Sequence, residues 1–429
     1  MTDILDLPEG PQVLATHGVE RWKDSYVADV LRYYLPFIGA IPDSAWGDIP
    51  FAAPWKQGWA TQIENRVTEA TTLRNKLGEI GGNLIYAAAI YSDSDLNAAV
   101  DVSNAAPASD GVLQAWLDPQ YSGTKISVDP NDDPPRPDYS DGPPENFEFP
   151  EGDGQDTERL SYLEHDVNLG KQFFTAPDSG PMDWEVALSQ MPDTPGRIKL
   201  DQFIQEGHYA KIFDGVSIVI ANGFTLDGSN PIKIFDECWS AQPKIIINRA
   251  ELVHVVARNY ANVNSRMEQG VTRLKDLWSS QGGAQAYFAL STSVTGYLDD
   301  IEAQATWLAE EGRNAGNAID KLLLAYANVG YEHIGTIIEK MQAYNDAVNG
   351  TFADVKTPAE ALFNALKGLG DVLLNEERSA NDMAQAESQV ADAADHSVEL
   401  DSSKGNAEVF PEGDDGYGVD DIDSGWSPN

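Results

Sequence analysis

Only a few side chains in this sequence have the types and the spacing that metal binding or catalysis requires. Glu251 and His254 are three residues apart, the spacing at which a helix presents two ligands to a di-iron centre. Such a centre needs a second Glu-x-x-His pair, and the sequence contains none. His254 also falls off the apolar stripe through Leu252 and Val256, so we expect it to face solvent.

A second candidate is the acidic stretch DPNDDP at residues 129–134, which begins like a calcium-binding loop. An EF-hand needs a glycine at its sixth position and a glutamate at its twelfth. Pro134 and Ser140 occupy those positions here. We therefore predict no EF-hand, while loose cation binding by so acidic a stretch stays open.

The motifs of several common enzyme classes are missing. The sequence has no phosphate-binding glycine loop, no His-Glu-x-x-His motif and no serine in a nucleophile elbow. Its single cysteine, Cys238, lies near Phe235 and Trp239, which favours a buried apolar thiol over a reactive one. We expect a protein without cofactor, without metal and without enzymatic activity.

Charge and hydropathy exclude several classes of partner. The 429 residues include 69 Asp and Glu against 28 Lys and Arg, which gives a formal net charge of −41. This charge repels nucleic acid and anionic lipid, so neither is an expected partner. No stretch reaches the roughly 18 apolar residues that span a bilayer. The acidic start MTDILDLPEG does not resemble a cleaved Sec signal peptide.

Composition divides the chain into segments that can fold and segments that cannot. Residues 104–182 are rich in Asp, Pro and Gly, residues 377–429 are rich in Asp and Gly, and both segments are poor in large apolar residues. Burial in such segments cannot offset the entropy lost on ordering, so we predict a disordered linker and a disordered acidic tail. Folded segments are expected at 18–103 and 183–376.

The first folded segment predicts a helical hairpin. Residues 19–41 have helical spacing, a turn containing Trp46 and Gly47 follows, and a helix of about 40 residues then runs to Tyr91. Apolar residues of this second helix recur at steps of three and four and form one stripe: Trp59, Ile63, Val67, Ala70, Leu73, Leu77, Ile80, Leu84, Ala88 and Tyr91. The first helix is too short to cover this stripe, which favours a second copy or a small helical partner.

Residues 249–349 predict a second, longer hairpin. Apolar residues recur at helical steps from Leu252 to Trp278 and again from Tyr287 to Val329, with SSQGG between them. Two long stripes joined by a Gly-Gly turn are most easily buried against each other as antiparallel helices. Gly312 and Gly316 are expected to mark close approach to a neighbouring element.

Shorter helices are expected around this hairpin. Thr194 and Asn230 are predicted N-caps, each followed by a proline. VSIVI at residues 216–220 could form a strand, but no second convincing strand exists to pair with it, so a buried helix is favoured. A final capped helix starts at Thr357. The expected fold is all-α, with long antiparallel hairpins in a four-helix-bundle-like arrangement.

The end of the first hairpin carries a pair of side chains suited to recognition. Tyr91 and Asp95 are four residues apart, so a helix end holds the ring and the carboxylate one turn apart, where a receptor can bind both. The same spacing occurs at two other places, Tyr162/Asp166 and Tyr417/Asp421. Only Tyr91 ends a long amphipathic helix that follows a Trp/Gly turn. The alternative is an ordinary polar helix end.

This combination resembles the Trp-X-Gly (Esx-type) substrates of type VII secretion and their longer PE/PPE and EspB-like relatives, of the actinobacterial type. The matching residues are Trp46 and Gly47 in the turn, Tyr91 and Asp95 after the helix, and Trp278 and Gly282 as the turn of a second module. Neither turn has the strict Trp-X-Gly spacing, and the second hairpin has no Tyr-x-x-x-Asp/Glu pair.

The resemblance implies a helical protein that is secreted or located at the cell surface without a cleaved Sec signal. It implies recognition of Tyr91 and Asp95 by the ATPase and chaperone machinery of type VII secretion, and a non-enzymatic role through protein contacts. Self-assembly or a small helical partner is compatible with this role. Two other interpretations stay open: a structural protein of a virus or phage, and the helical targeting part of an exported effector.

Overall fold

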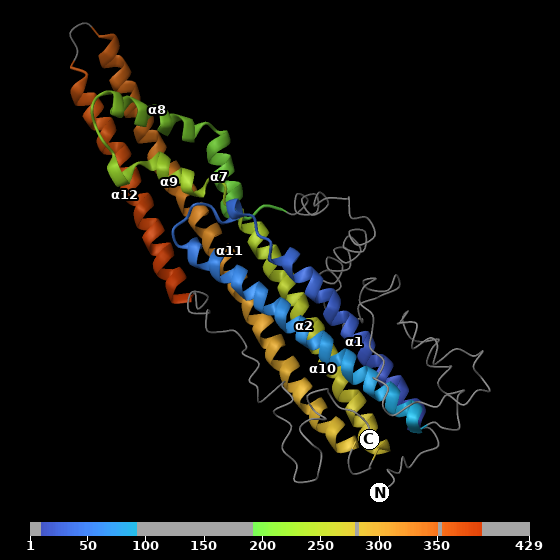
Figure 1. Ribbon diagram of the computed structural model, residues 1–429. Coiled ribbons are helices and arrows are strands. Elements are labelled where there is room, and N and C mark those ends of the chain that lie inside the picture. Colours follow the sequence, from blue (N-terminus) through green and yellow to red (C-terminus); the bar gives the residue numbers. More distant parts are fainter. Residues whose placement is uncertain (1–9, 92–191, 279–282, 351–353, 388–429) are drawn as a thin grey trace.

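The computed structural model describes residues 10–91, 192–278, 283–350 and 354–387. Every regular element in these ranges is a helix, and they contain no strand. The helices form one elongated body, and helix α11 runs along most of its length (Figure 1). The predicted all-α class is therefore confirmed. Within the same ranges, no helix combines the length and the apolar character needed to cross a bilayer.

The first hairpin consists of α1 (Gly10–Gly39), the 3-10 turn η1 (Asp43–Trp46) and α2 (Ala52–Tyr91). Its helices approach closely where Gly18 faces Gly81, since a Cβ on either glycine would lie 2.7 Å from the carbonyl oxygen of the other. Helix α1 begins well before the expected start at residue 18. The longer α1 therefore covers more of α2 than the sequence indicates, which weakens the case for a separate partner of α2.

The second hairpin pairs α10 (Pro243–Leu277) with α11 (Gly283–Asn349). Helix α11 has 67 residues, which at 1.5 Å per residue is a length of about 100 Å. Gly312 and Gly316 lie at close approaches, as expected. A Cβ on Gly312 would lie 2.5 Å from the indole of Trp59 in α2, and one on Gly316 would lie 2.5 Å from Ile247 in α10.

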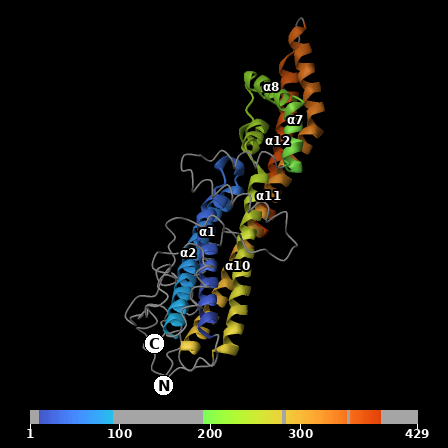
Figure 2. The ribbon, with the colours of Figure 1, turned by 90° about the vertical axis from the view of Figure 1, so that its right-hand side faces the viewer.

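The two hairpins lie side by side (Figures 1 and 2), with α1 in contact with α10 and α2 in contact with α11. Their apolar stripes face inward, and buried members include Leu73, Leu77, Ile80, Leu84, Val256, Tyr260, Val263, Leu298 and Ile301. We call α1, α2, α10 and residues 283–316 of α11 the four-helix unit.

The remaining helices gather at the other end of α11. They are α7 (Pro195–Gln205), α8 (His208–Ala221), α9 (Pro231–Cys238) and α12 (Lys356–Glu387), with the 3-10 turn η3 (Asp227–Ser229) before α9. We call these helices, together with residues 317–349 of α11, the cap. The segment VSIVI lies in α8 and is helical. Helix α12 continues to Glu387, beyond the expected end of the folded segment at residue 376.

The starts of α7 and α9 show two ways of satisfying free backbone N–H groups. Asn230 caps α9 as expected, because its side-chain oxygen accepts from Ile232 N at 3.0 Å. Thr194 occupies the N-cap of α7, but its side chain makes no capping bond. Asp320 of α11 replaces it and accepts from Gly196 N at 2.8 Å and Arg197 N at 3.2 Å. The free N–H groups at the start of α7 are therefore satisfied by a tertiary contact with α11.

Candidate functional site

The predicted recognition pair lies at the edge of the described structure. Helix α2 ends at Tyr91, which agrees with the helix end expected there. The Tyr91 side chain and Asp95 lie outside the described residues, as do the predicted linker at 104–182 and Gly282 of the second turn. The role of Tyr91 and Asp95 stays a prediction.

The turn of the first hairpin contacts the cap. Trp46 in η1 is buried, and Gly47 adopts a φ of 68°, a left-handed conformation that glycine tolerates best. A Cβ on Gly47 would lie 2.7 Å from the carbonyl oxygen of Glu237 in α9. The neighbouring Asp48 N donates to the same oxygen at 2.8 Å. Gly47 and Asp48 thus join the turn of the first hairpin to the end of α9.

Trp278 lies at the opposite end of the four-helix unit, just after α10. It is buried, and its ring stacks on Tyr287 of α11 with centroids 6.0 Å apart. Phe288 closes the same cluster in an edge-on contact at 6.3 Å. Trp278 therefore fills the end of the second hairpin.

The residues considered for metal or nucleophile chemistry have structural roles. Glu251 forms an ion pair with Arg313 of α11 at 2.7 Å. His254 is half-buried on α10, which differs from the solvent-facing side chain that we expected. The described residues hold no group of three or more His, Cys, Asp or Glu side chains placed to bind a metal ion. Cys238 is buried as expected, and burial raises the pKa of its thiol.

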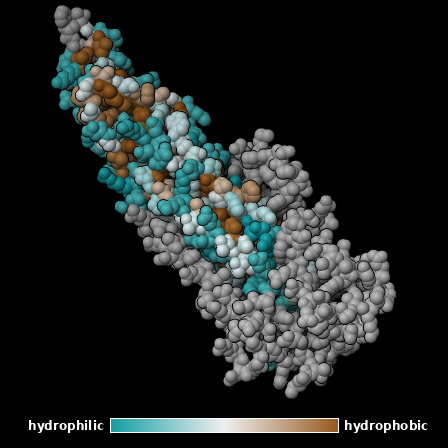
Figure 3. All heavy atoms as spheres, in the orientation of Figure 1, coloured by the Kyte–Doolittle hydropathy of each residue, from teal (hydrophilic) through white to brown (hydrophobic). Residues whose placement is uncertain are grey.

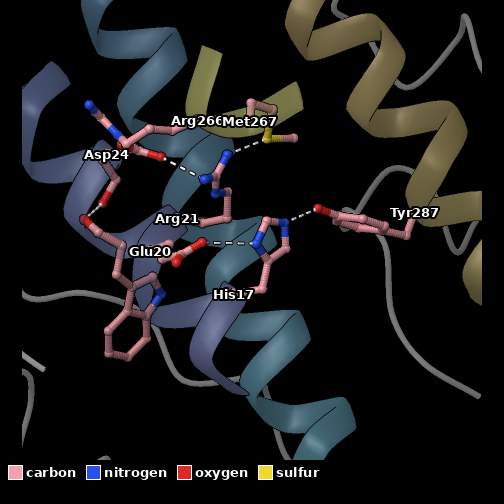
Figure 4. Close-up of polar contacts among 9 residues, drawn as sticks. His17, Glu20, Arg21, Asp24, Arg266, Met267 and Tyr287 are labelled. Atoms are coloured by element: carbon pink, nitrogen blue, oxygen red, sulfur yellow. Dashed lines mark hydrogen bonds and ion pairs between the residues drawn. The ribbon is translucent and has the colours of Figure 1, made fainter. Parts of the chain in front are cut away.

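Polar side chains are buried between the two hairpins (Figure 4). His17 of α1 is 4 % exposed, and its Nε2 lies 2.7 Å from the hydroxyl of Tyr287 in α11. Its Nδ1 lies 3.2 Å from Glu20, whose carboxylate can only accept, so Nδ1 donates to Glu20 and Nε2 accepts from Tyr287. Gly270 of α10 provides the space, because a Cβ there would lie 1.6 Å from the imidazole. Burial lowers the pKa of His17, which favours the neutral ring.

About two turns after His17 along α1, Asp24 joins α1 to α10. Asp24 is 1 % exposed, and its Oδ1 accepts from Arg266 Nε of α10 at 2.7 Å. Arg21 Nη2 lies 3.0 Å from the other carboxylate oxygen. Arg21 Nη1 also donates to the Met267 sulfur at 2.7 Å. One buried carboxylate therefore balances two guanidinium groups from different hairpins.

A second buried ion pair lies within α2. Arg66 Nη2 donates to Glu69 Oε1 at 2.6 Å, and both side chains are buried. The hydroxyl of Tyr297 in α11 donates to the backbone oxygen of Glu69 at 3.0 Å, which links this layer to the second hairpin. Burial outweighs the attraction of Arg66 and raises the pKa of the Glu69 carboxyl to about 7.

We call these groups, all of them buried except the half-buried Arg266, the polar interface: His17, Arg21, Asp24, Arg66, Glu69, Arg266, Met267, Tyr287 and Tyr297. A buried ion pair adds little net stability compared with apolar groups of the same size, but an unpaired buried charge is costly. Sliding one hairpin along the other by a turn would leave Asp24 and Arg266 without each other. We infer that the polar interface selects one register for the pairing of the hairpins.

Sequence reasoning did not find the polar interface, although a signal was present. His17, Arg21 and Asp24 are separated by four and three residues. They therefore fall on the same helical stripe as Leu14 and Leu31, where polar residues are unexpected. Abundant acidic residues elsewhere made any single carboxylate uninformative.

Comparisons with known protein families, with curated proteins and with solved structures found no match to this chain. Any functional assignment must therefore come from the residues and their geometry.

Proposed function

We propose that this chain is a non-enzymatic helical protein that is exported by a type VII secretion system and acts through protein contacts. The observation that carries the proposal is the pairing of two hairpins in one register, with α2 ending at Tyr91. Each hairpin has a buried tryptophan at its turn, Trp46 and Trp278. These features are compatible with the resemblance to Esx-type substrates described above.

A fixed register matters for export because a receptor binds a rigid recognition site more readily than a mobile one. The hydrogen bonds from Arg266 to Asp24 and from Tyr297 to Glu69 hold both helices of the first hairpin against the second. The end of α2 therefore keeps one position relative to the four-helix unit. A receptor that binds Tyr91 and Asp95 together would find them presented at the end of this rigid unit.

The environment of the titratable groups supports a non-enzymatic role. His17, Asp24 and Glu69 have the chemical types used in acid–base catalysis, but each is buried and bonded within the polar interface. A general acid or base must lie within hydrogen-bond reach of its substrate. Their partners are instead side chains of the protein itself.

Export can be tested with alanine variants of the full chain in its native host. Tyr91→Ala and Asp95→Ala should each accumulate in cells and be depleted from the culture supernatant, measured by quantitative immunoblotting of both fractions. Tyr162→Ala and Asp166→Ala are matched controls, because they alter the same spacing outside a hairpin end. Wild-type secretion of both Tyr91→Ala and Asp95→Ala would contradict the proposal.

A further inference from the structure

His17 is the histidine that joins the two hairpins. Within the described ranges it is the one buried histidine, and the other histidines there are half-buried. Its ring occupies the space that Gly270 leaves on α10 and meets Tyr287 of α11 edge-on, with centroids 6.0 Å apart. An imidazole enclosed in this way cannot reach solvent unless this part of α1 moves away from α10 and α11.

Both ring nitrogens of His17 are already in use in the neutral form (Figure 4). Nδ1 donates to Glu20, and Nε2 accepts from the hydroxyl of Tyr287. Burial raises the pKa of Tyr287 to about 12, so this hydroxyl keeps its proton throughout the neutral range. A second proton on the imidazole can bind only at Nε2, towards which the hydroxyl proton already points. Protonation therefore forces the Tyr287 hydroxyl to turn away and give up this acceptor.

The carboxylates that face this imidazole are shared with arginines. The hydrogen bond from the imidazole lowers the pKa of Glu20, and Arg21 and Arg273 of α10 lower it further. Asp24 is paired with Arg21 and, across the hairpins, with Arg266. Three guanidinium groups therefore surround two carboxylates.

The other two helices around His17 add no counter-charge. Helix α2 has no Asp, Glu, Lys or Arg between Ile80 and Tyr91, and α11 has none between Gly283 and Leu298. A protonated His17 is thus a fourth positive group beside two carboxylates, and a buried charge without its own counter-charge is costly. The described surface in Figure 3 is mostly hydrophilic, and water and salt screen the charges on such a surface. The acidity of the whole chain therefore does not replace a buried partner.

We propose that His17 is a latch: its neutral ring fastens the end of the four-helix unit that lies away from the cap, and its protonation releases that end. Burial lowers the pKa of His17 in the closed form, so the exposed ring binds a proton more readily. Opening is therefore favoured as pH falls below the ordinary histidine value of 6.5, and it levels off below the lowered pKa. Asp24 and Arg266 stay paired further along the unit, which confines the opening to residues 10–20 of α1 and the helix ends packed on them.

Under the proposed function, the latch also controls the recognition site. Helix α2 ends at Tyr91 in the released end of the unit (Figure 1), so opening frees the helix end that a receptor is proposed to bind. This step rests on the proposed export of the chain, whereas the latch itself does not. Opening measured on the purified protein therefore separates failure of the latch from failure of the export proposal.

Hydrogen exchange of the purified full-length protein between pH 5 and 8, corrected for the pH dependence of free amide exchange, measures the opening. In the wild type, the opening constant of residues 10–20 should rise by up to about tenfold per pH unit below 6.5, while α12 stays unchanged. His17→Gln keeps a donor and an acceptor but binds no proton, so the rise should disappear. His333→Gln, at a half-buried histidine of α11, is the control and should keep the rise.

A second variant covers the case in which His17→Gln opens this end at every pH. Glu20→Gln keeps an acceptor for Nδ1 and removes the carboxylate that favours the protonated ring, so the acid response should grow. NMR titration of the wild-type imidazole should give a midpoint below 6.5. The proposal is overturned if wild-type opening does not change with pH, if His17→Gln keeps the rise, if Glu20→Gln weakens it, or if His17 of the folded protein titrates at or above 6.5.

Discussion

The four-helix unit and the cap differ in what fills their interiors. Within the described residues, all buried side chains with a charged, amide or imidazole group belong to the four-helix unit, from His17 in α1 to Glu311 in α11. The interior of the cap is apolar and aromatic, and Phe203, Phe235 and Tyr326 meet there in ring contacts. The helices of both regions are amphipathic, so the two regions differ in the side chains that meet at the helix contacts.

Chain connectivity also differs between the two regions. In the cap, α7 and α8 are joined by Glu206 and Gly207 alone, so a short turn already places one helix beside the next. In the four-helix unit, residues 92–191 separate the first hairpin from α7, and no short turn aligns it with α10 and α11. We infer that the pair between Asp24 and Arg266 supplies the missing alignment, because a wrong register would leave charges unpaired.

The largest effect is expected from Phe203→Ala in the cap. Phe203 is fully buried, stacks on Phe235 with centroids 5.6 Å apart and meets Tyr331 edge-on at 5.2 Å. The cavity should lower the free energy of unfolding by about 3–5 kcal/mol, with little dependence on salt because no charge is involved. Hydrogen exchange should show lost protection in α7 and α9 while α10 stays protected. An equal loss of protection in α10 would show that the cap and the four-helix unit unfold together.

Asp24→Asn should have the next largest effect, in the four-helix unit. The amide keeps the size of the carboxylate but removes the charge that balances Arg21 and Arg266. Loss of one partner from a buried ion pair costs about 3 kcal/mol or more, which denaturant titration measures. Asp214→Asn on the exposed face of α8 is the control and should change the free energy of unfolding by about 0.5 kcal/mol or less. Equal stability of the two variants would remove the basis for the polar interface.

The smallest effect is a pH dependence that Glu69 contributes. Its folded-state pKa of about 7 lies above the ordinary glutamate value of 4.5, so the folded state binds the proton more tightly than the unfolded state does. The contribution of Glu69 to stability is therefore complete below pH 4.5 and is lost as pH rises towards 7. The slope is at most about 1.4 kcal/mol per pH unit for one proton.

Glu69→Gln should remove this slope, which comparison of unfolding curves between pH 4.5 and 7 would detect. Glu64→Gln, at an exposed position of α2, should keep it. His17 contributes in the opposite sense, because its lowered pKa gives stability that is lost as pH falls below 6.5. The variants must therefore be compared with the wild type at each pH. An unchanged slope in Glu69→Gln would show that Glu69 titrates normally.

The elements of the fold were readable from local patterns, because the apolar residues of long helices repeat along one stripe. The steps from Leu252 to Trp278 predict α10, and the steps from Tyr287 onward predict α11. The residues that cap the helix N-termini were harder to predict. Asn230 caps α9 from the adjacent position, whereas the bonds that cap α7 come from Asp320, more than one hundred residues away.

The pairing of side chains across the polar interface was not predictable for the same reason. The sequence separation is 242 residues between Asp24 and Arg266 and 270 between His17 and Tyr287. No local pattern relates residues so far apart, and only the pairing of the hairpins brings them together. The predicted recognition pair is the reverse case. Its spacing from Tyr91 to Asp95 is entirely local, but its function depends on a receptor outside the chain.

The continuity of α11 has a consequence for how this chain can change over time. Each residue of a helix turns the chain by about 100° and advances it by 1.5 Å. Adding or removing one residue between the part of α11 that faces α10 and the part that faces α12 would therefore swing the cap to a different side of the four-helix unit. Changes of about seven residues, close to two full turns, would preserve the relative direction and only alter the length. Substitutions here are local events, while single insertions or deletions rearrange the whole molecule.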